Sequence, residues 1–220
     1  GANVLAVNGN VTTAGAGTIA LTGADAVTAD ASSQIQAAAT VTISAGANDV
    51  TIDEVTSTAS TVTIDASAGG SILAADATNI ISGTVVTLNA SSAATESVGT
   101  DATRINTSAV TLAGTAGTGG FFVDETNDVA ITSIVVTGIG TVSVSSATGR
   151  IDESGAGINI ESGGNVVLAA ATSIGTGGIN GIDVQASDIA IVASNFDIAV
   201  PAGTDLTALS ITTDLAGAVR

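Results

Sequence analysis

The chain has 220 residues, of which 45% are hydrophobic and 10% charged, and its 20 acidic residues face three arginines, giving a formal net charge of −17. This charge excludes nucleic acid and anionic lipid headgroups as partners, because both would be repelled. The chain has no Cys, His, Lys or Tyr, which excludes disulfides and the usual general bases, thiol nucleophiles and amine nucleophiles. The hydrophobic content also argues against disorder.

A strand-sized phrase recurs through the first half of the chain: Ile19-Ala20-Leu21, Val41-Thr42-Ile43, Val62-Thr63-Ile64, Val86-Thr87-Leu88 and Val110-Thr111-Leu112. Successive phrases begin 22, 21, 24 and 24 residues apart. A regular period of this length indicates repeated units that stack on one another. The β-branched residues and the alternation of apolar and polar positions predict strands that are buried on one face.

Similar phrases continue less evenly through the second half: Val129-Ala130-Ile131, Val142-Ser143-Val144, Val166-Val167-Leu168, Ile189-Ala190-Ile191 and Leu209-Ser210-Ile211. Gly-rich stretches such as 117–120 separate them and favour tight turns. The uncharged segment 129–149 contains glycines and many Ser and Thr residues. We therefore interpret it as strands and not as a transmembrane helix.

We predict an all-β fold, a right-handed parallel β-solenoid of about ten coils of roughly 21 residues. It extends over residues 1–220 as one continuous rod with apolar ladders inside and Thr or Ser ladders outside. We expect Phe196 in the core and one of the pair Phe121 and Phe122 outside. Because the chain begins at Gly1 and contains no Met, we expect it to be a segment of a longer chain or filament.

The acidic residues suggest little chemistry. An apolar-Asp-Glu phrase occurs three times, as Ile52-Asp53-Glu54, Val123-Asp124-Glu125 and Ile151-Asp152-Glu153. Neighbouring residues on a strand point to opposite faces, so the dipeptide does not make the carboxylate pair of a glycosidase. We interpret these residues as coil corners and predict no catalytic and no cofactor-binding residues.

Calcium is a second use for carboxylate oxygens. Asp124, Glu125 and Asp128 lie within five residues, and weak binding of Ca²⁺ is an alternative there. The repeated calcium motif of some solenoids is matched only imperfectly, at residues 177–183. We therefore predict no specific metal site.

Two exterior patterns remain. Thr40, Thr42, Thr61 and Thr63 form Thr-x-Thr pairs typical of flat ice-binding solenoids, although the β-propensity of Thr also explains them. The triplets that begin at Asn10, Asn89 and Asn106 match the glycosylation acceptor, which a chain rich in Ser and Thr contains by chance.

Longer phrases carry a family resemblance, namely 119–125 followed by 127–131, and 164–170 followed by 173–178 and 182–191. They resemble the repeat regions of giant bacterial surface and secreted proteins of the filamentous-haemagglutinin-like class, whose rods are right-handed parallel β-helices. The resemblance implies an exported protein, extracellular or on the cell surface, whose rod presents adhesive regions or builds a fibre.

We therefore expect a structural or adhesive segment of an extracellular bacterial fibre or large surface adhesin, without catalytic activity. A carbohydrate-active β-helix enzyme and a calcium- or ice-binding solenoid module are the alternatives. The expected partners are further copies or further coils stacked head to tail, and cell-surface glycans or a host or prey surface. Nucleic acid and membrane insertion are not expected.

Overall fold

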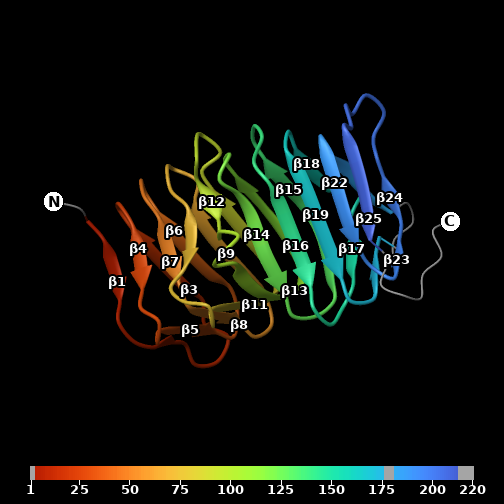
Figure 1. The fold of residues 1–220 in the computed structure, drawn as a ribbon. Helices are drawn as coiled ribbons and strands as arrows, with labels where there is room; N and C mark the ends of the chain where they lie inside the picture. Colours follow the sequence, from red (N-terminus) through yellow and green to blue (C-terminus); the bar gives the residue numbers. More distant parts are fainter. Residues whose placement is uncertain (1–2, 176–180, 213–220) are drawn as a thin grey trace.

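The computed structural model describes residues 3–175 and 181–212, which form strands and turns with no helix. Figure 1 shows the strands stacked along one axis, with β1 at one end and β25 at the other. The chain makes about nine turns of about 22 residues, and the strand pairs are parallel. The predicted parallel β-solenoid is confirmed, because each turn hydrogen-bonds to the next.

The first four turns have three faces. One face contains β1 (Leu5–Val7), β4 (Val27–Ala29), β7 (Val50–Ile52) and β10 (Ile72–Ala74), and it continues into β12 (Ser97–Val98) of the next turn. The second contains β2 (Val11–Thr12), β5 (Gln34–Ala37) and β8 (Glu54–Ser57), and the third contains β3 (Ile19–Gly23), β6 (Val41–Ala45) and β9 (Thr61–Ala66). The long strand β11 (Ile80–Ala90) continues both the second and the third face.

The later turns divide their faces differently. One face contains β14 (Gly120–Glu125), β16 (Val142–Ser146), β19 (Asn165–Ala170), β22 (Asp188–Val192) and β25 (Ala208–Thr212). The long strand β15 (Val129–Val136) pairs with the first strand of each of the other two faces. The second face contains β17 (Ile151–Glu153), β20 (Ser173–Ile174) and β23 (Asn195–Phe196). The third face contains β18 (Ile160–Ser162), β21 (Ile182–Gln185) and β24 (Ile198–Ala199). Strand β13 (Ile105–Ala116) pairs with β14 near its start and with β15 near its end, and so joins the two arrangements.

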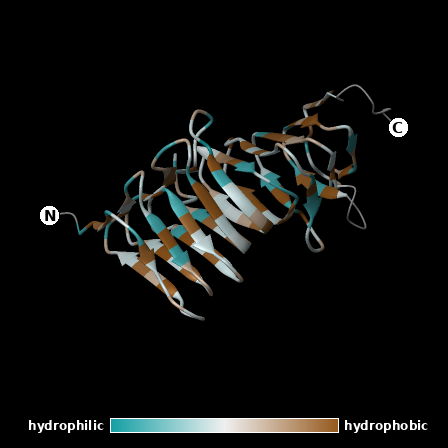
Figure 2. Ribbon diagram, turned by 90° about the horizontal axis from the view of Figure 1, so that it is seen from below, coloured by the Kyte–Doolittle hydropathy of each residue, from teal (hydrophilic) through white to brown (hydrophobic). Residues whose placement is uncertain are grey.

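One ladder of apolar residues runs through the described rod. Its ten rungs are Leu5, Val27, Val50, Ile72, Val98, Phe121, Val142, Val166, Ile189 and Leu209. The eight inner rungs, from Val27 to Ile189, are at most 1% exposed. Figure 2 shows the underlying pattern, in which hydrophobic and hydrophilic residues alternate along many strands. The core is therefore a narrow stack of side chains that are aliphatic except for Phe121.

The predicted phrases fall on two ladders and not on one. The ladder of Ile19, Val41, Val62 and Val86 continues to Leu112, not to Val110 as the spacing predicts. Val110 is 61% exposed, because β13 turns a corner there between two faces. The phrases at Val142, Val166, Ile189 and Leu209 belong to the ten-rung ladder on another face.

The three phenylalanines largely follow expectation. Phe121 is fully buried, and Phe122 points outward beneath Arg104, whose Cζ lies 5.9 Å from the ring centroid. Phe196 is half-buried and packs against the end of the core, so the prediction of a core residue is right in part. The uncharged segment 129–149 forms β15 and β16. Between residues 3 and 212, leaving out 176–180, the chain has no helix long and apolar enough to cross a membrane.

Candidate functional site

Several acidic side chains hold the turns at the coil corners. Asp30 accepts hydrogen bonds from the Ser33 hydroxyl at 2.6 Å and from the Ser32 amide at 3.3 Å. Asp76 accepts the amide and the hydroxyl of Thr78 at 2.7 and 2.8 Å. These hydrogen bonds stabilise the charged form and therefore lower the pKa of both carboxyl groups. The largest contribution comes from the Ser33 hydroxyl for Asp30 and from the Thr78 hydroxyl for Asp76. These carboxylates therefore serve as local turn caps.

Other acidic side chains connect neighbouring turns. Asp25 accepts the Asn3 amide at 2.7 Å, Asp49 accepts the Ser71 amide at 2.8 Å, and Asp128 accepts the Arg150 amide at 3.0 Å. In each pair the two residues are 22 positions apart, which is one turn of the solenoid. Each carboxylate thus satisfies a backbone donor that the strand ladder leaves free at the corner.

The first Asp-Glu phrase lies at one such corner. Asp53 is only 8% exposed, and burial raises its pKa, with further contributions from the charges of Asp76, Glu54 and Asp30. Glu54 points outward and accepts a hydrogen bond from the Gln34 side chain at 2.7 Å. The two carboxylates of this phrase therefore face different surroundings, as the strand geometry predicts.

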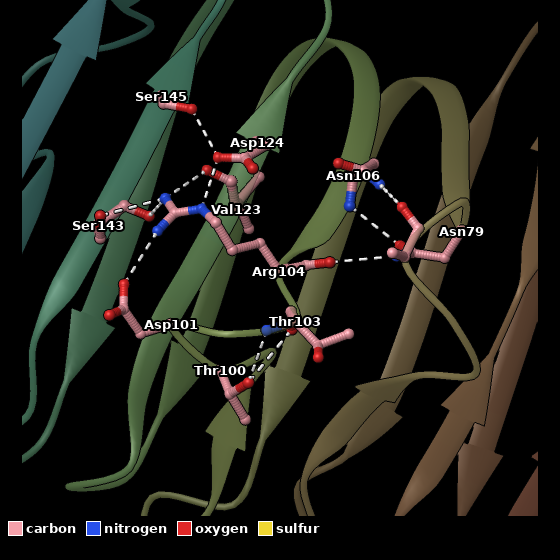
Figure 3. A network of polar contacts seen from close by, with 11 residues as sticks. Asn79, Thr100, Asp101, Thr103, Arg104, Asn106, Val123, Asp124, Ser143 and Ser145 are labelled. Atoms are coloured by element: carbon pink, nitrogen blue, oxygen red, sulfur yellow. Dashed lines mark hydrogen bonds and ion pairs between the residues drawn. The ribbon is translucent and has the colours of Figure 1, made fainter.

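The second phrase is part of a polar network around Arg104 (Figure 3). The Arg104 Nε forms an ion pair with Asp124, which also accepts the Ser145 hydroxyl at 2.6 Å. The Arg104 Nη2 donates to the carbonyl oxygens of Val123 at 3.0 Å and Ser143 at 2.8 Å. The Arg104 side chain is 17% exposed. One guanidinium thus connects three successive turns.

The network continues through Asn79, whose side chain is buried (Figure 3). Its amide nitrogen donates to the carbonyl oxygens of Asp76 and Arg104, and its oxygen accepts the backbone amide of Asn106 at 3.0 Å. Asn159 has an equivalent role further along the rod, donating to Ile131 and accepting from Asp183. No sequence motif marks Arg104, Asn79 or Asn159 as a network residue. The scarcity of basic residues was the one signal that favoured Arg104.

Glu125, the partner of Asp124 in the second phrase, is 1% exposed. Its carboxylate accepts the Thr107 hydroxyl at 2.8 Å and the backbone amides of Ala109, Thr126 and Asn127 at 3.0 to 3.3 Å. Burial raises its pKa, and these hydrogen bonds oppose the effect. Glu125 therefore closes the corner between β13 and β14, with both carboxylate oxygens engaged in hydrogen bonds.

The third phrase shares an arginine, Arg150, with one of the three carboxylates of the calcium alternative. Asp152 lies 2.8 Å from the Arg150 Nε, and Asp128 lies 3.4 Å from the same atom. Asp124, Glu125 and Asp128, the three expected oxygen donors, thus have different partners and do not converge. Within the described residues no three His, Cys, Asp or Glu side chains could hold a metal ion. The imperfect motif at 177–183 lies largely outside the described residues.

The outward threonines align over a short distance. Thr42, Thr63 and Thr87 are in register on β6, β9 and β11, and the row ends at Ala20 on one side and Ala113 on the other. The row of aligned threonines is therefore three residues long. Of the glycosylation triplets, Asn10 and Asn106 use their side chains in hydrogen bonds to neighbouring turns.

Two shallow grooves adjoin on the outer surface of the later turns. Their volumes are about 460 and 400 Å³, and both are lined by Ser162, Gly163 and Gln185. Ile139, which is 82% exposed, lines the first, and Asp205 lines the second. No arginine lines either groove. The grooves are neutral to acidic and suit uncharged or positively charged ligands better than anions.

No family model matches the chain, and neither the curated proteins nor the solved structures show a significant match to it.

Proposed function

We propose that this chain is a structural or adhesive segment of an extracellular bacterial fibre or large surface adhesin, and that it has no catalytic activity. The observation that carries the proposal is the ten-rung ladder, which gives the molecule a rod shape with one repeated unit along its length. In such a rod, the repeated turns supply length and stiffness, and each turn depends only on its neighbours.

The use of the acidic residues supports a structural function. In the second and third Asp-Glu phrases, Asp124 and Asp152 pair with arginines, and Glu125 accepts hydrogen bonds from a hydroxyl and from backbone amides. The remaining carboxylates give the surface a strong negative charge. Such a surface disfavours contact with other acidic surfaces and keeps a chain with so much apolar content from aggregating.

The proposed class is the filamentous-haemagglutinin-like repeat region, and its basis is the set of phrases quoted above. Export would place the rod outside the cell or on its surface. The proposed partners are further turns or further copies of the protein at the ends of the rod. Along its sides, the partners are cell-surface glycans or a host or prey surface, with the grooves around Ser162 and Gln185 as the first places to examine.

The test is to locate the protein in cells that produce it. Immunogold labelling with antibodies against the solenoid should mark the cell surface or extracellular fibres, and surface proteolysis of intact cells should remove the label. Label confined to the cell interior would contradict the proposal. Purified protein should also leave polysaccharides intact. Depolymerisation that disappears in the Asp124→Asn/Glu125→Gln double variant would favour the enzyme alternative.

A further inference from the structure

The two ends of the ten-rung ladder lie on the same face of the rod. Strand β1 contains its first rung, Leu5, and β25 contains its last, Leu209 (Figure 1). Within the described part of the chain, β1 pairs with β4 alone and β25 pairs with β22 alone. Each strand therefore presents one edge of backbone donors and acceptors without a strand beside it.

These two edges also present side chains of the core type. Leu209 is 54% exposed, whereas Ile189, the rung before it, is 1% exposed. Ile211 is half-buried and continues the parallel ladder of Val144, Leu168 and Ile191. At the other end Leu5 is half-buried and Val4 is 47% exposed. Neither β1 nor β25 contains a charged residue or a proline, which are the usual means of protecting an edge strand.

We infer that β25 of one molecule pairs in parallel with β1 of a second copy, so that the ladder continues from one molecule into the next. Leu209 then lies opposite Leu5, Ser210 opposite Ala6, and Ile211 opposite Val7. The inference rests on the proposed structural function and identifies the partner at the ends of the rod.

The occupant is a second copy in head-to-tail orientation, because that arrangement continues what the ladder already does. Each of its nine steps joins parallel strands with apolar residues facing inward, and β1 offers the same sense and the same alternation. A tail-to-tail contact would instead pair β25 with β25 in antiparallel orientation. The head-to-tail contact is heterologous and does not close, so it propagates as a filament. Copies with a charge of −17 repel one another, so assembly increases with ionic strength.

The absence of cysteine from the sequence provides a clean crosslinking experiment. Ala6→Cys and Ser210→Cys place a thiol on the outward side of β1 and β25. The two single variants are mixed in raised salt and oxidised, and the products are separated without reductant. Paired strands lie about 4.8 Å apart, which is compatible with a disulfide. A mixed dimer containing both variants is expected, and the double variant should form a series of higher multimers.

The control is Ala190→Cys, which lies in the same outward row one turn before Ser210. Mixed with Ala6→Cys, it should give no dimer. Leu209→Asp should return the protein to monomers in sedimentation experiments in raised salt. At low ionic strength, where charge repulsion opposes assembly, its melting temperature should match that of the unmodified protein, because Leu209 is already exposed in the single molecule.

Three results would overturn the inference. The first is a Ser210→Cys homodimer in place of the mixed dimer, which indicates tail-to-tail pairing. The second is equal crosslinking of Ala6→Cys with Ala190→Cys. The third is a stable monomer of the unmodified protein at all salt concentrations, which means that the edges are covered in some other way. Cell-surface labelling together with a monomer would defeat the assembly alone, whereas filaments found only inside cells would defeat the proposed function.

Discussion

The ring of Phe121 occupies the space that a side chain on Gly114 would need. A Cβ atom built on Gly114 would lie 2.5 Å from the Phe121 Cε2 and even closer to the carbonyl oxygen of Leu88. Phe121 is the largest fully buried side chain, and it lies beside the strand, β13, at which the arrangement of faces changes. Glycine at position 114 thus allows the one large rung of the ladder to fit a coil built for aliphatic residues.

Gly114→Ala should therefore lower the free energy of unfolding by about 1–3 kcal/mol through overpacking. Urea denaturation measures this loss. Ala113→Ser, which changes the adjacent outward position, is the control and should change the free energy by less than about 0.5 kcal/mol. In a double-mutant cycle, Phe121→Leu should recover part of the loss, with a coupling of about 0.5 kcal/mol or more. Strict additivity of the two changes would contradict the proposed contact.

The interior ladder can be tested with two neighbouring residues. Ile64 is fully buried between Ile43 and Leu88, whereas Thr63 points outward in the row of Thr42 and Thr87. Ile64→Asp should cost more than about 3 kcal/mol, because it buries a charge without a partner. Thr63→Asp should cost less than about 1 kcal/mol. Thermal melting of both variants compares them directly, and equal shifts would mean that the register is wrong.

The fold was predictable because the apolar residues that face the core recur at the period of the repeat. Val41, Val62 and Val86 lie in one ladder at the spacing that the phrases predict. The spacing failed at Val110, because the next turn is longer and Leu112 takes the position two residues later. A shift of two residues keeps the inward alternation, so the pattern of apolar residues cannot distinguish the two registers.

The roles of the polar residues were much less predictable. Glu125 is buried because β13 brings Thr107 and Ala109 beside it, 18 and 16 residues earlier in the chain. These separations are shorter than the repeat of about 22 residues, so periodicity gives no indication of the contact. Asp124 and Glu125 are adjacent in the sequence and together suggest calcium ligands, yet the two side chains point to opposite sides of the strand and have different partners.

The Arg104 network should contribute to stability because it spans three turns. Arg104→Ala removes the ion pair to Asp124 and the hydrogen bonds to Val123 and Ser143, at an expected cost of about 2 kcal/mol. Arg104→Lys should recover only part of this, because an ammonium group lacks the planar fork of donors. The control is Asp101→Asn. The Asp101 side chain is 90% exposed and 3.8 Å from Arg104, so its loss should cost less than about 0.5 kcal/mol. Chemical denaturation distinguishes these cases. Equal effects of Arg104→Ala and Asp101→Asn would contradict a stabilising role of the Arg104 network.

The stability of the rod should pass through a maximum in mildly acidic solution. Burial raises the pKa of Asp53 and of Glu125, so folding favours their protonated forms, and stability increases as the pH falls from neutral through their folded pKa values. The pKa values of Asp30 and Asp76 are lowered by hydrogen bonds to Ser33 and Thr78. Their contribution is complete above the usual aspartate pKa of about 4 and is lost as the pH falls through the lowered values.

Asp53→Asn separates the buried carboxylate from the general effect of charge. It should raise the melting temperature at neutral pH and reduce the further gain on acidification, because Asn resembles the protonated acid and needs no counter-charge. Asp65→Asn is the control. It removes one negative charge from an outward-facing side chain that accepts the Ser67 amide, so it should not reduce the gain on acidification. Melting curves recorded between about pH 3 and pH 8 span the usual pKa values of both kinds of carboxyl group. A melting temperature that falls steadily from neutral pH downward, or an identical pH profile for the two variants, would show that burial of Asp53 does not govern the response.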